Sequence, residues 1–339
     1  MRVLKVGMVG AGPVAQAIHL PTIARLGGRA RVTKVMDVNP AVAAAVAGPL
    51  GATTSGSIEE FLSQEPVDIA VIGSPDVFHA GQIEAVCAAG VRGILAEKPL
   101  ATSLDEAERV ADAVRRSGAA FVVGAMHTYD PAWLAGSAAF GDAGPFHVRS
   151  AIYIPSNSRF EDMATTMVRP EAASRPAPTP AQLLRGGVLG LAIHNLPLIR
   201  RFIPRLDEVS FAAPVQPWGY VITASGEAGS VELIARTGGT WRPDWTLSIW
   251  GRRDELVLDF PPSYVHGGSA VAALTSAGAT TTWGPFPRNG YEAEWRELLD
   301  IIDGGAPRYP VSALIDDLQY ALRLADLATA SVTKTGEAA

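Results

Sequence analysis

The stretch VGMVGAGPVAQAIHL at residues 6–20 decides the fold of the first part of this chain. A short apolar run is followed by Gly10, Gly12 and Ala15 in the spacing G-x-G-x-x-A, and then by an apolar helical pattern. In such a loop the first glycine permits a tight turn, the second lets a pyrophosphate approach the backbone, and the alanine keeps helix and strand close. The residues predicted to line a dinucleotide here are Gly10, Ala11, Gly12, Pro13 and Val14.

The runs that follow continue as an alternation of strands and helices. VTKVMD, VDIAVIG, RGILAE and AAFVVGA have the nearly continuous hydrophobicity of parallel strands that are covered on both faces. Helical patterns stand between them, and Ser103 with Glu106 gives one of these helices a capping-box signal. This alternation predicts an α/β fold over residues 1–125, with the doubly wound parallel sheet of an NAD(P)-binding Rossmann domain.

After about residue 125 the pattern changes to a series of strands with turn signals between them. Runs from FHVRSAIYI to DELVLDF predict a large, mostly antiparallel open sheet, with helices at about 181–203, 290–303 and 311–330. We therefore expect residues 126–339 to form an α+β domain for substrate binding and oligomerisation. The helix at 311–330 could pack back on the Rossmann domain. The proline-rich residues 169–180 are interpreted as a surface excursion.

Asp37 ends the second predicted strand, roughly 20 residues beyond the glycine loop. A carboxylate at this position can accept both ribose hydroxyls of an adenosine and would repel a 2′-phosphate, which favours NAD over NADP. The positive charge of the nearby Lys34 leaves NADP open. The alternative interpretation of Asp37 is a turn-forming acid with no ligand.

Further candidates follow the third long strand, whose end lies at the same edge of the predicted sheet. Ser74, Pro75 and His79 stand in IGSPDVFHAGQ and are predicted to touch the cofactor. The alternative for His79 is a surface residue in the first turn of a helix.

Lys98 is one of only four lysines in the chain and follows the apolar run GILAE. Pro99 restricts its backbone, and the predicted strand end places it on the cofactor edge. In a partly dry crevice an ammonium can lose its proton and exchange it with a substrate oxygen, whereas a guanidinium cannot. Lys98 is therefore the candidate acid–base residue; the alternative is a surface lysine paired with Glu97.

Taken together, these motifs resemble the Gfo/Idh/MocA family of sugar and cyclitol oxidoreductases. The resemblance rests on the glycine loop, Asp37, SPDVFHAGQIEAVCAAG, EKP and GGVLGLAIHNL, and it covers nearly the whole chain. It implies hydride transfer between a nicotinamide and a secondary carbinol of a polyol or ketosugar. It also implies that Lys98 and His194 are catalytic, that Glu97 and His127 lie at the cofactor, and that the open sheet mediates a dimer or tetramer.

The chain departs from the family pattern around His194. The aspartates that active members typically carry four residues before and three residues after this histidine are replaced by Gly190 and Pro197, and Thr128 replaces a common arginine. Pro197 should also distort the helix. Lys98 and His194 would then handle the hydroxyl proton with help from further substrate-binding residues. These are Tyr129, Tyr153 and Asn195.

Two other functions stay open at this point. The chain could be a nucleotide-binding sensor or assembly protein without catalysis, or an NAD-dependent glycoside-cleaving enzyme with an internal redox relay. Its net charge of −6 argues against nucleic acid as a partner. The absence of a leader or of a long apolar stretch predicts a cytoplasmic protein without a membrane partner. The single cysteine, Cys87, and the scattered histidines give no metal-ligand spacing.

Overall fold

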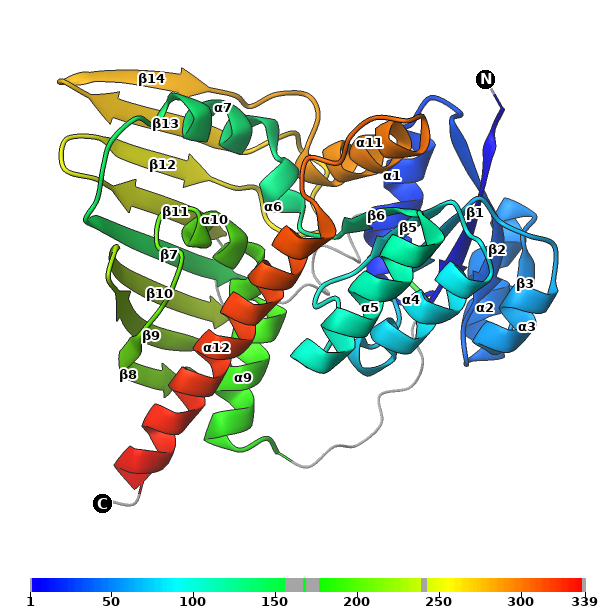
Figure 1. Ribbon diagram of the computed structural model, residues 1–339, viewed down its shortest axis with the longest axis horizontal. Coiled ribbons are helices and arrows are strands. Elements are labelled where there is room, and N and C mark those ends of the chain that lie inside the picture. The colour runs from blue at the N-terminus through cyan, green and yellow to red at the C-terminus, as the bar shows by residue number, and fades with distance from the viewer. Residues whose placement is uncertain (1, 156–166, 169–176, 239–242, 337–339) are drawn as a thin grey trace. The chain divides into compact units, whose positions relative to one another are not determined.

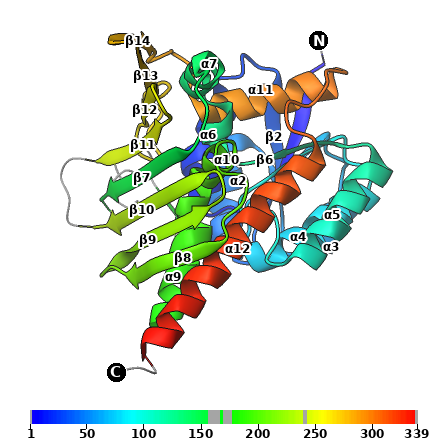
Figure 2. The same cartoon turned by 60° about the vertical axis from the view of Figure 1, so that its left-hand side comes forward.

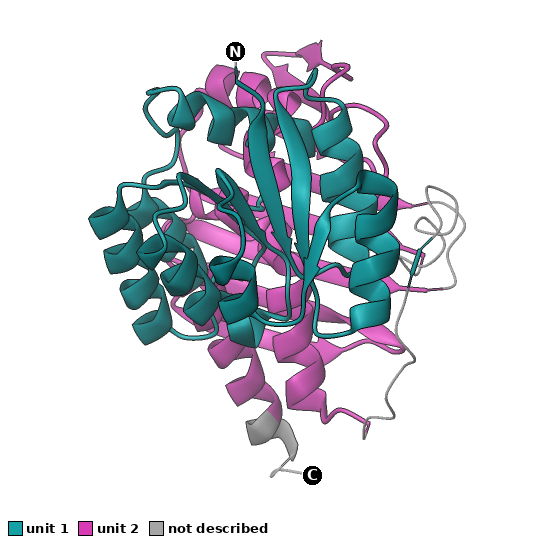
Figure 3. Ribbon diagram, turned by 90° about the vertical axis from the view of Figure 1, so that its right-hand side faces the viewer, with its two compact units in different colours: residues 1–125, 161–173, 291–318 teal, residues 126–160, 174–290, 319–339 magenta. Residues whose placement is uncertain are grey.

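The computed structural model describes residues 2–155, 167–168, 177–238 and 243–336, and the chain divides into two compact units. Unit 1 comprises residues 1–125, 161–173 and 291–318; unit 2 comprises residues 126–160, 174–290 and 319–339 (Figure 3). Most of the predicted excursion at 169–180 lies outside the described residues. The assignment of residues 1–125 to cofactor binding and of 126–339 to substrate binding and oligomerisation stays a prediction.

The core of unit 1 is a six-stranded sheet. Its strands are β1 (Leu4–Val9), β2 (Ala30–Met36), β3 (Thr53–Ser55), β4 (Ile69–Ile72), β5 (Gly93–Ala96) and β6 (Ala120–Val123). They pair in the order β3-β2-β1-β4-β5-β6, and every pair is parallel. All residues of β4, β5 and β6 are buried, because helices cover both faces of the sheet. The predicted doubly wound parallel sheet is confirmed.

All but the last of the following helices of unit 1 lie between these strands along the chain (Figure 1). They are the π-helix η1 (Ala15–His19), α1 (Leu20–Ala24), α2 (Pro40–Ala47), the 3₁₀ turn η2 (Gly48–Leu50), α3 (Ile58–Ser63), the 3₁₀ turn η3 (Asp76–Phe78), α4 (His79–Ala88), α5 (Leu104–Ser117) and α11 (Gly290–Ile302). The first helix therefore opens with a π turn, a feature often found at functional sites. The last helix, α12 (Val311–Gly336), belongs to unit 1 up to Leu318 and to unit 2 beyond it.

The carboxyl ends of the central strands lie level with one another. The register pairs Val9 with Met36, Val9 with Ile72, and Ile72 with Ala96. The ladder continues one residue further, because Gly10 N–H donates to Met36 and Glu97 N–H donates to Ile72, both at 2.8 Å. The first residues after β2, β1 and β5 are Asp37, Gly10 and Glu97. They therefore lie at the same edge of the sheet.

The core of unit 2 is an eight-stranded sheet. Its strands are β7 (Phe146–Ile154), β8 (Glu208–Pro214), β9 (Trp218–Gly226), β10 (Gly229–Thr237), β11 (Asp244–Trp250), β12 (Glu255–Asp259), β13 (Val271–Ser276) and β14 (Ala279–Trp283). The order is β14-β13-β12-β11-β7-β10-β9-β8, and only β7 and β10 pair in parallel. The predicted mostly antiparallel sheet is confirmed. β13 and β14 are not predicted from the sequence. β14 is exposed and lacks apolar alternation.

Helices cover one face of this sheet. They are α6 (Met126–Tyr129), α7 (Pro131–Ala139), α9 (Pro180–Gly190), the 3₁₀ turn η4 (Ala192–His194) and α10 (Leu196–Arg200). Figure 2 shows α7, α9 and α10 on the same side of the strands, and the opposite side carries no helix of unit 2 within the described ranges. Nowhere in the described part of the chain is there a helix both long and apolar enough to cross a bilayer.

Candidate functional site

The turn after β1 has the geometry that a pyrophosphate site requires. Gly10 has φ +96°, and a Cβ built on it would lie 2.7 Å from the backbone of Gly73, so only glycine fits. A Cβ built on Gly12 would meet nothing within 4 Å, so open space adjoins that part of the backbone. Pro13 and Val14 follow as half-buried residues. The loop thus leaves room for a phosphate where the sequence predicts one.

Asp37 is held at the end of β2 by two backbone bonds. One carboxylate oxygen accepts the N–H of Ala11 at 2.9 Å, and the other accepts the N–H of Asn39 at 2.8 Å. The side chain is half-buried, so its remaining lone pairs can accept hydroxyl groups. Ala11 is buried and donates its N–H to Asp37, which orients this carboxylate; its role in binding the cofactor stays a prediction.

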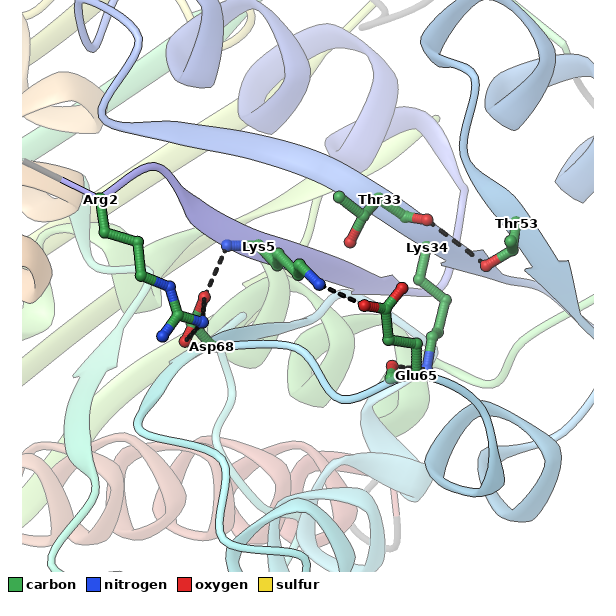
Figure 4. A network of polar contacts seen from close by, with 7 residues as sticks. All are labelled: Arg2, Lys5, Thr33, Lys34, Thr53, Glu65 and Asp68. Atoms are coloured by element: carbon green, nitrogen blue, oxygen red, sulfur yellow. Dashed lines mark hydrogen bonds and ion pairs between the residues drawn. The ribbon is translucent and has the colours of Figure 1, made fainter.

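Lys34 does not supply a charge for a 2′-phosphate, which corrects the reason for keeping NADP open. Its side chain is buried, and its ammonium donates to the carbonyl of Phe61 at 2.6 Å. It also donates to the carbonyl of Glu65 at 2.7 Å (Figure 4). Burial lowers the pKa of this ammonium, and the charge of Glu65 opposes that shift. Lys5 forms an ion pair with the same glutamate. Both lysines therefore serve the structure around α3.

His79 ties two loops of this edge together. Its ring is buried, with Nδ1 2.7 Å from the carbonyl of Pro99 and Nε2 2.8 Å from the carbonyl of Ser74. The interpretation as a surface residue is therefore wrong. Ser74 donates its hydroxyl to Gln82 at 2.6 Å, and Pro75 is exposed. Ser74 and Pro75 remain open to a ligand, whereas His79 fixes the turn that follows Lys98.

Lys98 is the second residue after β5 and follows Glu97, which begins at the same sheet edge as Asp37 and Gly10. Burial lowers the pKa of its ammonium, and the negative charges of Glu97 and Asp76 oppose that shift without cancelling it. The side chain is half-buried rather than an exposed member of a surface ion pair. Lys98 therefore has the two properties that the sequence analysis requires, a strand-end position and an ammonium that loses its proton more readily than usual.

The Glu97 carboxylate points towards other residues of unit 1. Burial raises its pKa, but the hydrogen bond with His19 and the neighbouring positive charges, which include Lys98, together outweigh burial, so the pKa falls below its ordinary value. Its Oε1 lies 3.0 Å from His19 Nε2, and its Oε2 accepts the backbone N–H of Lys98 at 3.3 Å. Glu97 is thus an ionised group next to the candidate acid–base residue.

A second group of predicted residues comes together inside unit 2. The Asn195 side chain accepts from His127 Nδ1 at 2.7 Å and donates to the Ser150 hydroxyl at 2.9 Å. Burial lowers the pKa of His127 to about 4 although the bond to Asn195 opposes it, so the ring is neutral at pH 7. Since Nδ1 carries the proton, Nε2 is left as an acceptor.

His194 completes this group. Its ring centroid lies 5.9 Å from that of His127 and 5.5 Å from that of Trp245, and the His127 ring also stacks on Phe260 at 3.8 Å. Trp245 is buried, so it fills the interior beside the two histidines. The structure therefore unites His194, His127 and Asn195, with His194 the most accessible of the three.

The two predicted tyrosines are in different places. Tyr129 is buried in α6. Tyr153 is on β7, where Val148, Ser150 and Ile152 are buried towards the helix-covered face, so the alternation of the strand places Tyr153 on the opposite face. The structure thus does not bring Tyr153 together with the His194 group, because a strand directs successive side chains to opposite faces. Its role in substrate binding stays a prediction.

The departures from the family pattern have local structural counterparts. Gly190 ends α9, and a Cβ there would lie 3.3 Å from the Trp218 ring, so the indole occupies the space beside this position. Pro197 does not distort a continuous helix: the chain breaks after α9 and passes through η4, and Pro197 lies in the first turn of α10. Proline is tolerated there because a first-turn N–H has no intrahelical partner. Thr128 is buried in α6.

Sequence reasoning misses four residues that surround the glycine loop and Glu97. They are Gln16, His19, Glu294 and Trp295. Gln16 is buried in η1 and pairs its amide with both backbone groups of Val168 at 3.0 Å. The only sequence signal is that Gln16 and His19 are the polar residues of an otherwise apolar helix start. No feature of the sequence predicts that α11 packs beside Gln16 and His19.

The described residues contain no cluster of three or more histidine, cysteine or carboxylate side chains able to hold a metal ion. The expectation that no metal takes part stays a prediction. Cys87 is buried, and burial raises the pKa of its thiol above the ordinary value although Ser117 bonds to it. Cys87 is therefore a core-packing residue, as its apolar surroundings in the sequence predict, and not a reactive thiol.

Comparison with known proteins supports this account of the first unit. Residues 4–125 match the sequence model of a family described as an oxidoreductase family with an NAD-binding Rossmann fold. A stretch of the chain resembles inositol 2-dehydrogenase 2 of Paenarthrobacter aurescens, at 36% identity over 137 residues. That stretch is 39% of this chain and 40% of the other protein, so the matched part covers well under two thirds of the relative's length.

Solved structures share the fold over nearly the whole chain. UDP-N-acetylglucosamine 3-dehydrogenase GnnA from Acidithiobacillus ferrooxidans superimposes with a TM-score of 0.73 at 19% identity, covering 97% of this chain and 99% of that one. A myo-inositol dehydrogenase from Corynebacterium glutamicum gives a TM-score of 0.68 at 19% identity, covering 97% and 98%. At such identities the likeness establishes the fold alone.

Proposed function

We propose that this protein is a nicotinamide-dependent dehydrogenase of the Gfo/Idh/MocA family, because residues 4–125 match the model of an oxidoreductase family with an NAD-binding Rossmann fold. Its substrate is a secondary alcohol or ketone of a sugar, cyclitol or related polyol. The observation that carries the proposal is the position of Lys98, which is half-buried, has a lowered ammonium pKa, and lies on the sheet edge that also holds the glycine loop and Asp37.

The residues of this edge fit a dinucleotide. The open backbone at Gly12 would hold the pyrophosphate, and the Asp37 carboxylate would accept the adenosine ribose hydroxyls. When bound, the nicotinamide supplies the acceptor or donor of the hydride. Asp37 supports NAD as the cofactor, and the commitment of Lys34 to α3 removes the one charge that favoured NADP.

Lys98 manages the proton that accompanies hydride transfer. In the oxidation direction its neutral amine accepts the hydroxyl proton while the carbon gives up the hydride, and in the reduction direction the ammonium returns that proton to the oxygen. The lowered pKa of Lys98 increases the fraction of neutral amine near pH 7. Glu97, ionised beside it, keeps the ammonium form accessible as well.

His194 is the second catalytic residue of this proposal. Its ring is half-buried, and it contacts the neutral His127, whose orientation is fixed by Asn195. We assign His194 to the substrate oxygen and His127 to the nicotinamide ribose, and we include Tyr129 and Asn195 as residues that position this group. The inositol dehydrogenases that resemble part of this chain favour cyclitols among the substrates.

The proposed enzyme works in the cytoplasm as a homo-oligomer. The face of the unit 2 sheet opposite its helices supports the homo-oligomer, because it presents polar and aromatic groups together. His147 stacks on Trp250, with the ring centroids 5.5 Å apart, and bonds to Ser230 at 2.8 Å. A second copy of this sheet face is the proposed partner, as a dimer or a tetramer.

The test compares two lysine variants. Lys98→Met should lower kcat/KM for the best polyol or ketosugar of a panel by a factor of about 10²–10⁴, the range of a lost acid–base group, and leave NAD binding measurable. Lys5→Met is the matched control, since Lys5 lies at the start of β1 and pairs with Glu65. Activity is followed by absorbance of the reduced nicotinamide. Equal activity of Lys98→Met and Lys5→Met would refute the assignment, and tight NAD binding without turnover on any substrate would favour a sensor.

A further inference from the structure

A closed polar cluster lies behind Lys98 within unit 1, and the proposed function does not yet use it. It consists of His19 from η1, Glu97 after β5, and Glu294 and Trp295 from α11. His19 and Trp295 are 0% exposed and Glu294 is 1% exposed. Burying this many polar groups is costly unless each is bonded or uncharged, so their protonation states are constrained.

The contacts of His19 fix its tautomer. The indole Nε1–H of Trp295 donates to His19 Nδ1 at 3.2 Å, and an indole N–H can only donate. Nδ1 is therefore the acceptor nitrogen of a neutral ring, and the ring proton is on Nε2. That proton points to Glu97 Oε1, 3.0 Å away. His19 thus orients the carboxylate with a hydrogen bond but does not neutralise its charge.

The Glu97 carboxylate is held from other sides as well. Its Oε2 accepts the backbone N–H of Lys98 at 3.3 Å. A Cβ built on Gly124 would lie 3.0 Å from Oε1, so the carboxylate packs against a backbone that has no side chain. Only together with the His19 bond do these contacts hold the group towards Lys98.

Glu294 adds a second carboxyl group to the cluster. Its Oε2 is buried and makes no hydrogen bond to any described residue. Burial raises the pKa of Glu294 well above its ordinary value, and the negative charge of Glu97 raises it further. The two carboxyl groups therefore divide into an ionised Glu97 and a neutral Glu294, as expected for like groups that share a dry site.

We propose that His19 and Trp295 are positioning residues that hold the ionised Glu97 carboxylate as the counter-charge of Lys98 and so set how readily Lys98 exchanges its proton. The catalytic meaning of this inference rests on the proposed function. The titratable groups that face Glu97 from the elements packed around it are Lys98, His19, His79 and Glu294. The charged groups that face Lys98 are Glu97 and Asp76.

The direction of the effect follows from the charges. Glu97 opposes the fall that burial causes in the pKa of Lys98. If the carboxylate loses its donor and rotates away, that opposition weakens and Lys98 loses its proton at lower pH. Trp295→Phe removes the bond that fixes the His19 tautomer, and His19→Leu removes the donor itself. His19→Gln restores an N–H donor and should return the titration towards that of the wild type.

The main experiment titrates Lys98 directly. Lysines are ¹³C-methylated on the amine, and NMR follows the Lys98 signal with pH in the full chain without substrate; Lys98→Met identifies the signal. The Lys98 midpoint should move to lower pH in Trp295→Phe and in His19→Leu. Thr22→Val is the matched control, because Thr22 is buried in α1 and its hydroxyl bonds to no described residue. A midpoint in Trp295→Phe equal to that of Thr22→Val overturns the proposal, even if His19→Leu does not fold.

A second measurement concerns Glu294 and needs no activity. Because its pKa is raised in the folded protein, the wild type should lose stability as pH rises above the unfolded value of 4.5, and Glu294→Gln should not. The variant should therefore gain in unfolding temperature relative to the wild type as the pH increases, with no gain below that value. Parallel curves would contradict the division of the two carboxyl groups into an ionised Glu97 and a neutral Glu294. Since both measurements omit substrate, they separate failure of this proposal from failure of the dehydrogenase function.

Discussion

Two substitutions in the glycine loop separate folding from cofactor binding. Gly10→Ala places a methyl group 2.7 Å from the backbone of Gly73 at φ +96°, whereas Gly12→Ala places the same group in open space. We expect the first variant to destabilise unit 1 without any ligand. The second should fold normally and bind NAD poorly, because its methyl group would fill the space that a pyrophosphate needs.

The structure gives the size of each effect. For Gly10→Ala, unfavourable backbone geometry costs about 1–3 kcal/mol and the clash with fixed backbone atoms adds about 1–3 kcal/mol, for a total of roughly 2–6 kcal/mol. For Gly12→Ala, stability should stay within about 0.5 kcal/mol of the wild type. Losing one hydrogen bond to a charged phosphate costs about 1.5–3 kcal/mol, which raises the NAD dissociation constant roughly 10- to 150-fold.

Thermal unfolding of the apoprotein and calorimetric titration with NAD measure the two effects separately. Gly10→Ala should unfold at a temperature lower by roughly 5–20 °C, given about 2–4 °C per kcal/mol for a domain of this size class. Gly12→Ala should unfold at the same temperature as the wild type and bind NAD more weakly. The reasoning is refuted if Gly12→Ala binds NAD as tightly as the wild type, or if Gly10→Ala is as stable as Gly12→Ala.

Two further predictions concern the other ligand group and the buried histidine. Asp37→Ser should weaken NAD binding by about 1.5–3 kcal/mol and NADP binding by less, because the carboxylate that bonds the ribose hydroxyls also repels a 2′-phosphate; competition titrations with both nucleotides measure the change in preference. The unfolding free energy of unit 2 should fall by up to about 3 kcal/mol as pH drops from 6.5 towards 4, because the unfolded chain protonates His127 in this window and the folded chain does not. Urea unfolding at several pH values checks this, and a His127→Gln variant that retained the full loss would contradict it.

Some site features could be predicted from sequence because they depend on residues close together in the chain. Gly10, Gly12 and Asp37 follow strands whose ends are marked by apolar runs, so their place at one edge follows from parallel topology. The same reasoning placed Lys98 after β5. Lys34 shows the limit of such reasoning, since its three-residue spacing from Asp37 suggested proximity while its side chain is bonded to the carbonyls at the end of α3.

The sequence by itself determined the parallel sheet, the glycine turn and the strand-end position of Lys98, because strand periodicity and glycine conformation act over a few residues. Only the tertiary structure decided that His19 meets Glu97 and Trp295, and that Tyr153 is separated from His194 by the sheet. His19 and Trp295 are 276 residues apart, and α11 reaches the first helix through packing of apolar surface that local pattern does not encode. The charge state of a buried group depends on such distant neighbours, so the environment of Lys98 emerges only in the folded chain.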